Sequence, residues 1–245
     1  MEKRYWYVIL TYVLMQLSSL VGIPLLLYFE LVTGENTREA ITNAQILWII
    51  ISFILGLVIT LILLRKDLTA NYRSIQRSSV GETIAWSIGG IFLAMLAQGV
   101  AANIEVQLFG IEAGSENTQQ IMELVRMTPL LIIVVSVIGP ILEEIIFRKI
   151  IFGSLYKRFN FFISGIVSSV LFAVVHMEFE HLLLYSAMGF TFAFLYVKTK
   201  RIIVPIFAHV AMNTLVVVIQ TVFADDIERI MREAEQLQGF VAWLL

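Results

Sequence analysis

Apolar residues in this chain gather in seven long segments that short polar loops separate. The segments cover residues 6–28, 44–64, 83–108, 129–156, 161–177, 182–197 and 202–223. A helix needs about 20 apolar residues to cross the hydrocarbon core of a membrane, which is about 30 Å thick. The pattern therefore predicts an all-α fold, a polytopic transmembrane helical bundle of about seven spans.

Two shorter stretches have the spacing of amphipathic helices. Residues 117–126 place Ile121, Met122 and Val125 on one side, which predicts a short helix before the fourth span. Residues 224–245 predict an amphipathic C-terminal helix, lying at the membrane surface or packed on the bundle. Within the fourth span a Gly-Pro pair at 139–140 predicts a kink, because proline lacks the N–H donor and clashes with the preceding turn.

Composition agrees with a membrane protein and excludes several other classes. Hydrophobic residues make up 59% of the 245 residues and charged residues 15%, whereas about 25% of a soluble domain is charged. The net charge of -2, without a basic face, gives no indication of a nucleic-acid partner. Because the chain has no cysteine, it has no disulfide, thiolate nucleophile or cysteine-based metal site.

The charges of the loops alternate along the chain. Basic residues mark the N-terminus, the 65–77 loop and the turns at 157–158 and 198–201, whereas the other loops are acidic. The positive-inside rule then predicts a multi-pass protein of the cell membrane with a cytoplasmic N-terminus. The N-terminal segment lacks a small-residue cleavage site, so we interpret it as the first membrane helix and not as a signal peptide.

Several polar residues lie inside the predicted spans, where an ionised group costs at least about 2.5–3.5 kcal/mol and often marks a functional site. They are Glu143, Glu144 and Arg148 in the fourth span, His176 at the end of the fifth, and His209 and Asn213 in the seventh. By contrast, we expect Glu105 to approach the membrane interface at the end of the third span. We expect Glu178, Glu180 and His181 to form an exposed link between the fifth and sixth spans.

Counting residues along the helices predicts that these groups share a depth. Glu143 lies 14 residues before the turn at 157–160, and His176 lies 16 residues after it. At 1.5 Å per residue the two side chains are roughly 21 and 24 Å from the turn, so they are nearly level. His209 and Asn213 are spaced i, i+4 and share one helix face. We therefore predict that the four groups converge in a cavity near the middle of the membrane.

The residue types indicate hydrolysis of an amide bond. Glu144 and Arg148, also at i, i+4, can neutralise each other, which leaves Glu143 as the free carboxylate. A buried carboxylate beside an imidazole at the same depth is suited to act as a general base on water. His209 and Asn213 carry donors for an oxyanion. Such Glu–Arg and His–Asn pairs are often purely structural, but their shared depth favours a site.

A metal site is the alternative interpretation of the same residues. Glu143, His176 and His209 all carry zinc-ligand atoms, and His176 with Glu180 has the i, i+4 spacing of two ligands on one helix face. However, the chain contains no HExxH motif, and asparagine is a poor zinc ligand. The sequence therefore favours a site without a metal and keeps zinc as the alternative.

Three motifs in this region resemble those of a known protease family. EEIIFR at Glu143–Arg148 matches an EExxxR motif, FAVVH at Phe172–His176 an FxxxH motif, and HVAMN at His209–Asn213 an HxxxN motif. Each motif alone is weak, but in this order and spacing they are similar to the CPBP (Abi) family of CAAX proteases and bacteriocin-processing enzymes. The resemblance covers residues 125–220 and is closest in kind to a bacterial, Bacillus-like member.

The resemblance implies the CAAX prenyl endopeptidase fold and the activity of an intramembrane glutamic endopeptidase, a hydrolase without a cofactor. It implies that Glu143 and His176 activate water, that His209 and Asn213 bind the oxyanion, and that Glu144, Arg148 and Phe172 support them. Zinc stays the alternative here too, because the family was long described as metal-dependent.

We expect one membrane domain over residues 1–245, with N-terminal accessory spans at 1–110 and a catalytic core at 125–220. The expected partners are the lipid bilayer and a small peptide or membrane-protein segment, cleaved in peptide maturation, self-immunity or signalling. The alternatives are a non-enzymatic membrane scaffold or bacteriocin self-immunity protein, and a transporter with a carboxylate proton relay. No inverted repeat is visible in the sequence, which counts against a transporter.

Overall fold

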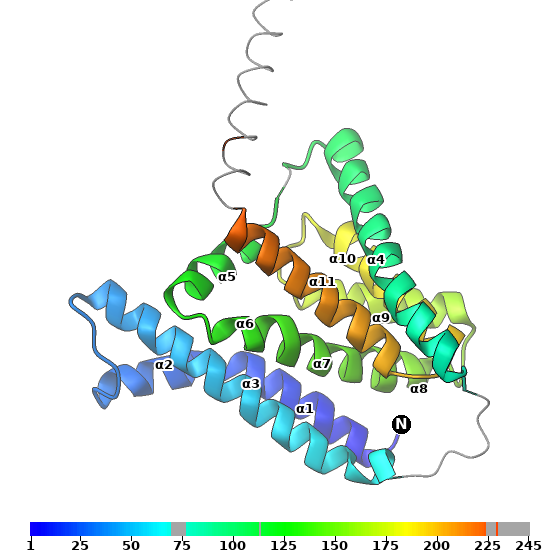
Figure 1. Ribbon diagram of the computed structural model, residues 1–245. Coiled ribbons are helices and arrows are strands. Elements are labelled where there is room, and N and C mark those ends of the chain that lie inside the picture. The colour runs from blue at the N-terminus through cyan, green and yellow to red at the C-terminus, as the bar shows by residue number, and fades with distance from the viewer. Residues whose placement is uncertain (70–76, 113, 224–228, 230–245) are drawn as a thin grey trace, which may run out of the picture.

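The computed structural model describes residues 1–69, 77–112, 114–223 and 229, and all regular structure within these ranges is helical (Figure 1). The α-helices are α1 (Lys3–Leu17), α2 (Ser19–Tyr28), α3 (Thr37–Thr69), α4 (Val80–Phe109), α5 (Glu116–Met127), α6 (Leu131–Ile133), α7 (Gly139–Glu143), α8 (Gly153–Leu155), α9 (Phe161–Val174), α10 (Leu182–Thr199) and α11 (Ile203–Val222). Two π-helical segments, η1 (Val134–Ile138) and η2 (Glu144–Phe152), lie between α6 and α8. The predicted all-α fold is confirmed.

Four of these helices, α3, α4, α10 and α11, are long and apolar enough to cross a membrane. A fifth crossing results if α1 and α2, which meet at an angle of 47°, form one broken span, and α9 is a shorter apolar helix. The structure thus confirms a multi-pass helical membrane protein, but the predicted count of seven spans is not confirmed.

The run from α6 to α8 lies at the centre of the bundle. On one side α1 and α2 pack against α3, and on the other side α10 packs against α4, α9 and α11 (Figure 1). The central run contacts both groups, since η1 packs on α3 and α11 while η2 packs on α1, α9 and α10. This run carries the EExxxR motif, so the motif is surrounded by helices from both halves of the chain.

The central run is not a regular α-helix. Its π-helical segments lie on both sides of Gly139–Pro140, the position where the sequence predicts a kink. Pro140 lies near the start of α7, directly after η1, and has no N–H to donate to the preceding π-helical turn. The switch back to π-helical turns comes between Glu143 and Glu144, and π-helical turns of this kind occur frequently at functional sites.

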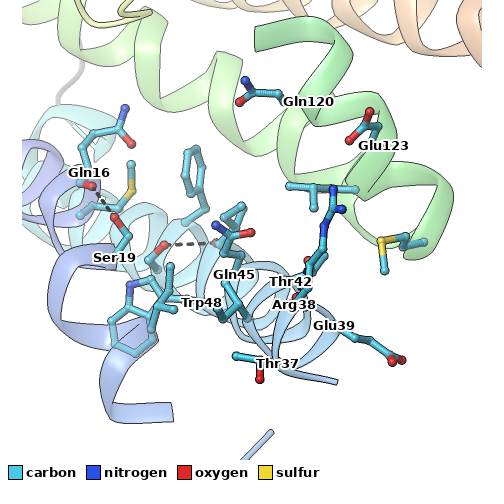
Figure 2. A pocket seen from close by; sticks show the side chains of 18 of the residues that line it. Gln16, Ser19, Thr37, Arg38, Glu39, Thr42, Gln45, Trp48, Gln120 and Glu123 are labelled. Carbon is cyan, nitrogen blue, oxygen red and sulfur yellow. Dashed lines mark hydrogen bonds between the residues drawn. The ribbon is translucent and has the colours of Figure 1, made fainter. Parts of the chain in front are cut away.

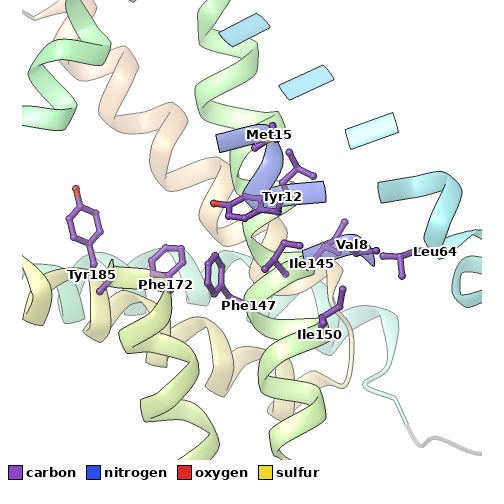
Figure 3. Packing of buried hydrophobic residues seen from close by; sticks show 12 residues of the cluster. Val8, Tyr12, Met15, Leu64, Ile145, Phe147, Ile150, Phe172 and Tyr185 are labelled. Carbon is purple, nitrogen blue, oxygen red and sulfur yellow. The ribbon is translucent and has the colours of Figure 1, made fainter. Parts of the chain in front are cut away.

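A hydrophobic cluster joins α1 and α3 to the central run and continues to α9 and α10. Figure 3 shows it extending from Val8 and Leu64 through Phe147 to Phe172 and Tyr185. Phe147 makes edge-on contacts with Tyr12 of α1 and with Phe172 of α9, at ring-centroid distances of 6.0 and 5.4 Å. The N-terminal helices are therefore part of the same core as the motif-bearing helices.

The short helix predicted over 117–126 is present as α5. Met122 and Val125 are buried, and Ile121 packs beside them against apolar residues of α3, the central run and α11. The predicted C-terminal helix at 224–245 lies, apart from residue 229, outside the described residues.

Candidate active site

The two adjacent glutamates occupy different environments. Glu143 is the last residue of α7 and Glu144 the first residue of η2. The side chain of Glu144 is completely buried, whereas that of Glu143 is 17% exposed. A buried carboxylate needs partners to offset its desolvation, so the contacts of each glutamate indicate its role.

Glu144 holds two partners at once. Its Oε2 lies 3.2 Å from Nε of Arg148, so the predicted ion pair is present. Its Oε1 lies 3.0 Å from Nδ1 of His209 in α11. Because a carboxylate accepts hydrogen bonds, Nδ1 of His209 is the donor, which fixes the orientation of that ring.

Arg148 is fully buried and covered by aromatic rings. Its guanidinium carbon lies 4.2 Å from the ring centroid of Phe172 and 5.3 Å from that of Phe192. Among the described residues, its two Nη atoms have no hydrogen-bond partner. The ring faces and the Glu144 carboxylate are thus the groups that offset the buried charge.

His209 lies between the two carboxylates. Its Nε2 is 3.8 Å from Oε2 of Glu143, a distance too long for a hydrogen bond but within the range of an ion pair. Its ring stacks on Phe192 at 4.7 Å between centroids. The sequence placed His209 on the oxyanion side and did not predict its contacts with both glutamates.

His176 follows α9 and is held by its backbone and by an aromatic neighbour. Nδ1 donates to the carbonyl oxygen of Phe172 at 2.8 Å, since a carbonyl can only accept. In the neutral ring Nε2 is therefore an acceptor. The imidazole stacks on Tyr185 with 4.1 Å between centroids, and Glu143 is close enough to interact with it electrostatically.

Phe172 and Asn213 complete the set that the sequence singled out. The ring of Phe172 is fully buried and lies within 4.7 Å of the His176 centroid and 5.8 Å of the His209 centroid. Asn213 lies one turn beyond His209 on α11 and is half-buried. In the described structure no hydrogen bond joins its carboxamide to the other residues of the set.

The link between α9 and α10 corrects one prediction. Glu178 and His181 were expected to be exposed, but both are partly buried and have partners. Oε2 of Glu178 accepts from the Tyr185 hydroxyl at 2.5 Å and Oε1 accepts from the backbone N–H of Asn117 at 2.8 Å. The expectation failed because the α5 N-terminus, distant in sequence, packs on this link.

Glu105 is the second correction. The sequence placed it near the membrane interface, but its side chain is 2% exposed. Its carboxylate lies 2.9 Å from Nδ1 of His181 and accepts from the backbone N–H of Leu184 at 2.9 Å. Residue 180 is exposed, as predicted.

A metal site requires at least three suitable ligands around one point. Within the ranges that the structure describes, no three His, Cys, Asp or Glu side chains are arranged to hold a metal ion. The Nδ1 atoms of His176 and His209 are engaged with Phe172 and Glu144, which leaves their Nε2 atoms available. The arrangement of the described side chains gives the zinc alternative no support, and we derive no step through a metal.

The fold and site together define an integral-membrane helical protein with a buried glutamate–histidine centre. A family profile described as "Type II CAAX prenyl endopeptidase Rce1-like" matches residues 125–215, the segment that contains all three motifs. The chain is 55% identical over 220 residues to "Putative membrane peptidase YdiL" of Bacillus subtilis (strain 168), covering 90% of each chain. It is 32% identical over 238 residues to "Membrane-embedded CAAX protease MroQ" of Staphylococcus aureus (strain USA300), covering 94% of this chain and 96% of the relative.

A shorter similarity, 35% identity over 81 residues, links the chain to "UPF0177 protein YxdF" of Lactococcus lactis subsp. lactis (strain IL1403), covering 33% of this chain and 44% of the relative. No solved structure matches the chain. The two longer alignments extend over nearly the whole sequence. The chain belongs to the Rce1-like CAAX protease family, and it is a membrane-embedded protease.

Proposed function

We propose that this protease hydrolyses a peptide bond in a small peptide or a membrane-protein segment, using water activated by Glu143 and His176. The difference between the two glutamates carries the proposal. Glu144 is fully buried and engaged by Arg148 and His209, whereas Glu143 keeps an exposed edge. Of the two, Glu143 is the carboxylate with the freedom to meet water.

In the proposed reaction a water molecule donates one proton to Glu143 as its oxygen attacks the carbonyl carbon of the substrate. The lone pair on Nε2 of His176 accepts a hydrogen bond from the same water and orients it. The resulting tetrahedral intermediate collapses when the C–N bond breaks, and Glu143 passes its proton to the leaving amine. Water is consumed, a carboxylic acid and an amine are released, and Glu143 returns to its ionised form.

The oxyanion is assigned to His209 and Asn213. Since Nδ1 of His209 donates to Glu144, Nε2 can donate to an oxyanion only in the doubly protonated ring. The carboxamide of Asn213, one turn further along α11, supplies the second donor in this proposal.

The substrate is proposed to be a peptide that matures or signals at the bacterial membrane, with bacteriocin processing as one such role. A relative carries "CAAX protease" in its name. We propose that this chain acts on bacterial peptide or membrane-protein segments. We propose the cell membrane as its location, with the N-terminus in the cytoplasm.

The proposal is tested by exchanging Glu143 for glutamine. Loss of a general base lowers the rate by about 10²–10⁴-fold, so Glu143→Gln is expected to abolish detectable cleavage. The measurement is comparative peptidomics of cells that produce the wild type or the variant. Glu112→Gln, at an exposed position between α4 and α5, serves as the matched control and is expected to leave the peptide profile unchanged. A wild-type profile in Glu143→Gln cells would overturn the mechanism.

A further inference from the structure

A large cavity lies between the N-terminal helices and α5, apart from the catalytic residues. Its volume is about 1060 Å³, at the upper end of the range for small-molecule sites. α1 and α2 form one wall, α3 forms the floor, and α5 lies opposite (Figure 2). Most of its lining thus comes from helices that carry none of the three protease motifs.

Apolar side chains make up the larger part of the lining of this cavity, and uncharged hydrogen-bonding side chains lie among them. Gln16, Thr42 and Gln45 face it, and Gln120 reaches it from α5 (Figure 2). Ser52 of α3 also belongs to the lining. Amide side chains both donate and accept, whereas the hydroxyls of Thr42 and Ser52 already donate to carbonyl oxygens of α3 and keep lone pairs that can accept. Such a lining complements an occupant that carries both donors and acceptors.

Charged residues of both signs lie among the lining residues. Arg38 and Glu39 belong to the first turns of α3, and Glu123 belongs to α5. One of these carboxylates is already engaged, because Glu39 accepts from the backbone N–H of Glu35 at 2.9 Å. Because positive and negative side chains both lie in the lining, the cavity has no electrostatic potential of one sign that would favour a strongly charged occupant.

The inner end of the cavity adjoins the helix that carries Glu143. A Cβ built on Gly139 of α7 would lie 3.7 Å from the ring of Phe53, which lines the cavity. Gln16, also in the lining, donates from Nε2 to the hydroxyl oxygen of Tyr12 at 3.5 Å. Tyr12 in turn is close enough to Glu143 to interact with it electrostatically.

We propose that this cavity binds an extended, unlipidated segment of the substrate next to the bond that Glu143 cleaves. A peptide backbone presents one donor and one acceptor at nearly every residue, which the amide and hydroxyl lining can satisfy. A prenyl chain would leave those groups without partners, which costs free energy. The proposal rests on the proposed function, and it gives the N-terminal helices a role in substrate recognition.

The absence of native cysteine makes a blocking experiment possible. A single cysteine is introduced at Gln45, inside the cavity, and in a second protein at Leu55, an exposed apolar position on the same helix. Each purified protein is placed in liposomes and treated with N-ethylmaleimide. The substrate is a peptide and membrane-protein extract from cells producing Glu143→Gln, and products are measured by mass spectrometry.

Modification of the Gln45→Cys protein is expected to lower product formation at least about tenfold, as expected when a substrate segment is excluded from its site. The treated Leu55→Cys protein is expected to cleave like the wild type, and the effect of modification is measured against the untreated Gln45→Cys protein. A Gln45→Leu variant, which loses one hydrogen-bonding group, is expected to raise KM about fivefold to tenfold with little change in kcat.

Two results would overturn the inference while leaving the protease mechanism intact. One is undiminished cleavage by the fully modified Gln45→Cys protein. The other is the finding that the products lost on this modification carry prenyl groups. If the thiol introduced by Gln45→Cys does not react with N-ethylmaleimide, that result would also contradict an open cavity. If instead the wild type forms no products that Glu143→Gln lacks, the proposed function itself fails.

Discussion

At the scale of single residues, the aromatic side chains around the site hold its charged groups in place. Phe172 contacts both histidine rings and the guanidinium of Arg148. Tyr185 stacks on His176 and donates its hydroxyl to Glu178. The position of the His176 ring therefore depends on a residue that none of the three motifs contains.

Tyr185 is accordingly a positioning residue for His176. We expect Tyr185→Leu to lower kcat about tenfold with a small change in KM, because the imidazole loses its stacking partner and a misplaced group reacts slowly. Tyr185→Phe keeps the ring and is expected to retain most of the activity. Steady-state kinetics of the two variants measure kcat and KM and show whether the ring of Tyr185 is required. Equal losses in both would show that the hydroxyl, not the ring, is what His176 needs.

The Glu178 carboxylate predicts a pH dependence of stability. Burial raises its pKa, but hydrogen bonds from the backbone N–H of Asn117 and the hydroxyls of Tyr185 and Ser115 outweigh burial, so its pKa is lowered from the ordinary value of 4.5. A lowered pKa contributes stability above the unfolded-state pKa, and this contribution is lost as the pH falls through the folded-state pKa.

We therefore expect Glu178→Gln to be less stable than the wild type at neutral pH. The difference is expected to shrink as the pH drops below 4.5, where the wild-type carboxylate gains its proton. Thermal unfolding in detergent at a series of pH values measures both curves. A constant difference across that range would show that the carboxylate charge contributes nothing.

At the scale of elements, small residues set how closely the helices approach. Gly89 and Gly90 are adjacent in α4, and the two glycines differ in their surroundings. A Cβ on Gly90 would lie 2.7 Å from Cδ1 of Leu195 in α10 and 3.3 Å from Cβ of Ala208 in α11, whereas one on Gly89 would meet nothing within 4 Å. Gly90 is thus the residue that permits α4 to pack against both helices.

This difference provides a matched pair of substitutions. Gly90→Ala is expected to destabilise the protein by about 1–3 kcal/mol, because overpacking forces neighbouring side chains to shift. Gly89→Ala is expected to be neutral or to stabilise by up to about 1 kcal/mol, since alanine favours the helix. Thermal inactivation midpoints in the same detergent compare the two. Equal effects would contradict the assigned contact.

At the scale of the whole molecule, one buried aspartate ties the N-terminal helices to the central run. Asp67 of α3 has a side chain that is 1% exposed. Its Oδ1 lies 2.6 Å from Nη2 of Arg4 in α1, and its Oδ2 lies 3.8 Å from Nζ of Lys149 in η2. Two elements of the N-terminal side and one of the central run thus share one carboxylate.

Removing that charge is expected to loosen the N-terminal helices. Asp67→Asn removes a charged partner of Lys149 and leaves Arg4 paired with Glu2. Because both cations are partly exposed, the loss is expected to stay below the about 3–5 kcal/mol of a fully buried pair. Limited proteolysis and thermal unfolding in detergent measure the effect, with Glu35→Gln, an exposed position, as the control. Unchanged protease resistance and midpoint would show that the apolar cluster alone holds α1 and α3 in place.

The sequence by itself determined the membrane class, because long apolar segments have few stable alternatives to membrane helices. It also determined the Glu144–Arg148 pair, since i, i+4 spacing is a property of one helix. The three motifs were readable for the same reason, as each lies within a single short segment. The spacing of residues along one segment specifies which side chains share a face of the same helix.

Only the tertiary structure decided which groups meet across helices. The contact of His209 with both glutamates, the pairing of Glu105 with His181 and the anchoring of Glu178 all join residues far apart in the chain. Their partners depend on how helices rotate and cross, which residue spacing along one helix does not specify. The cavity beside α3 depends on the same packing, because its walls come from α1, α2, α3 and α5.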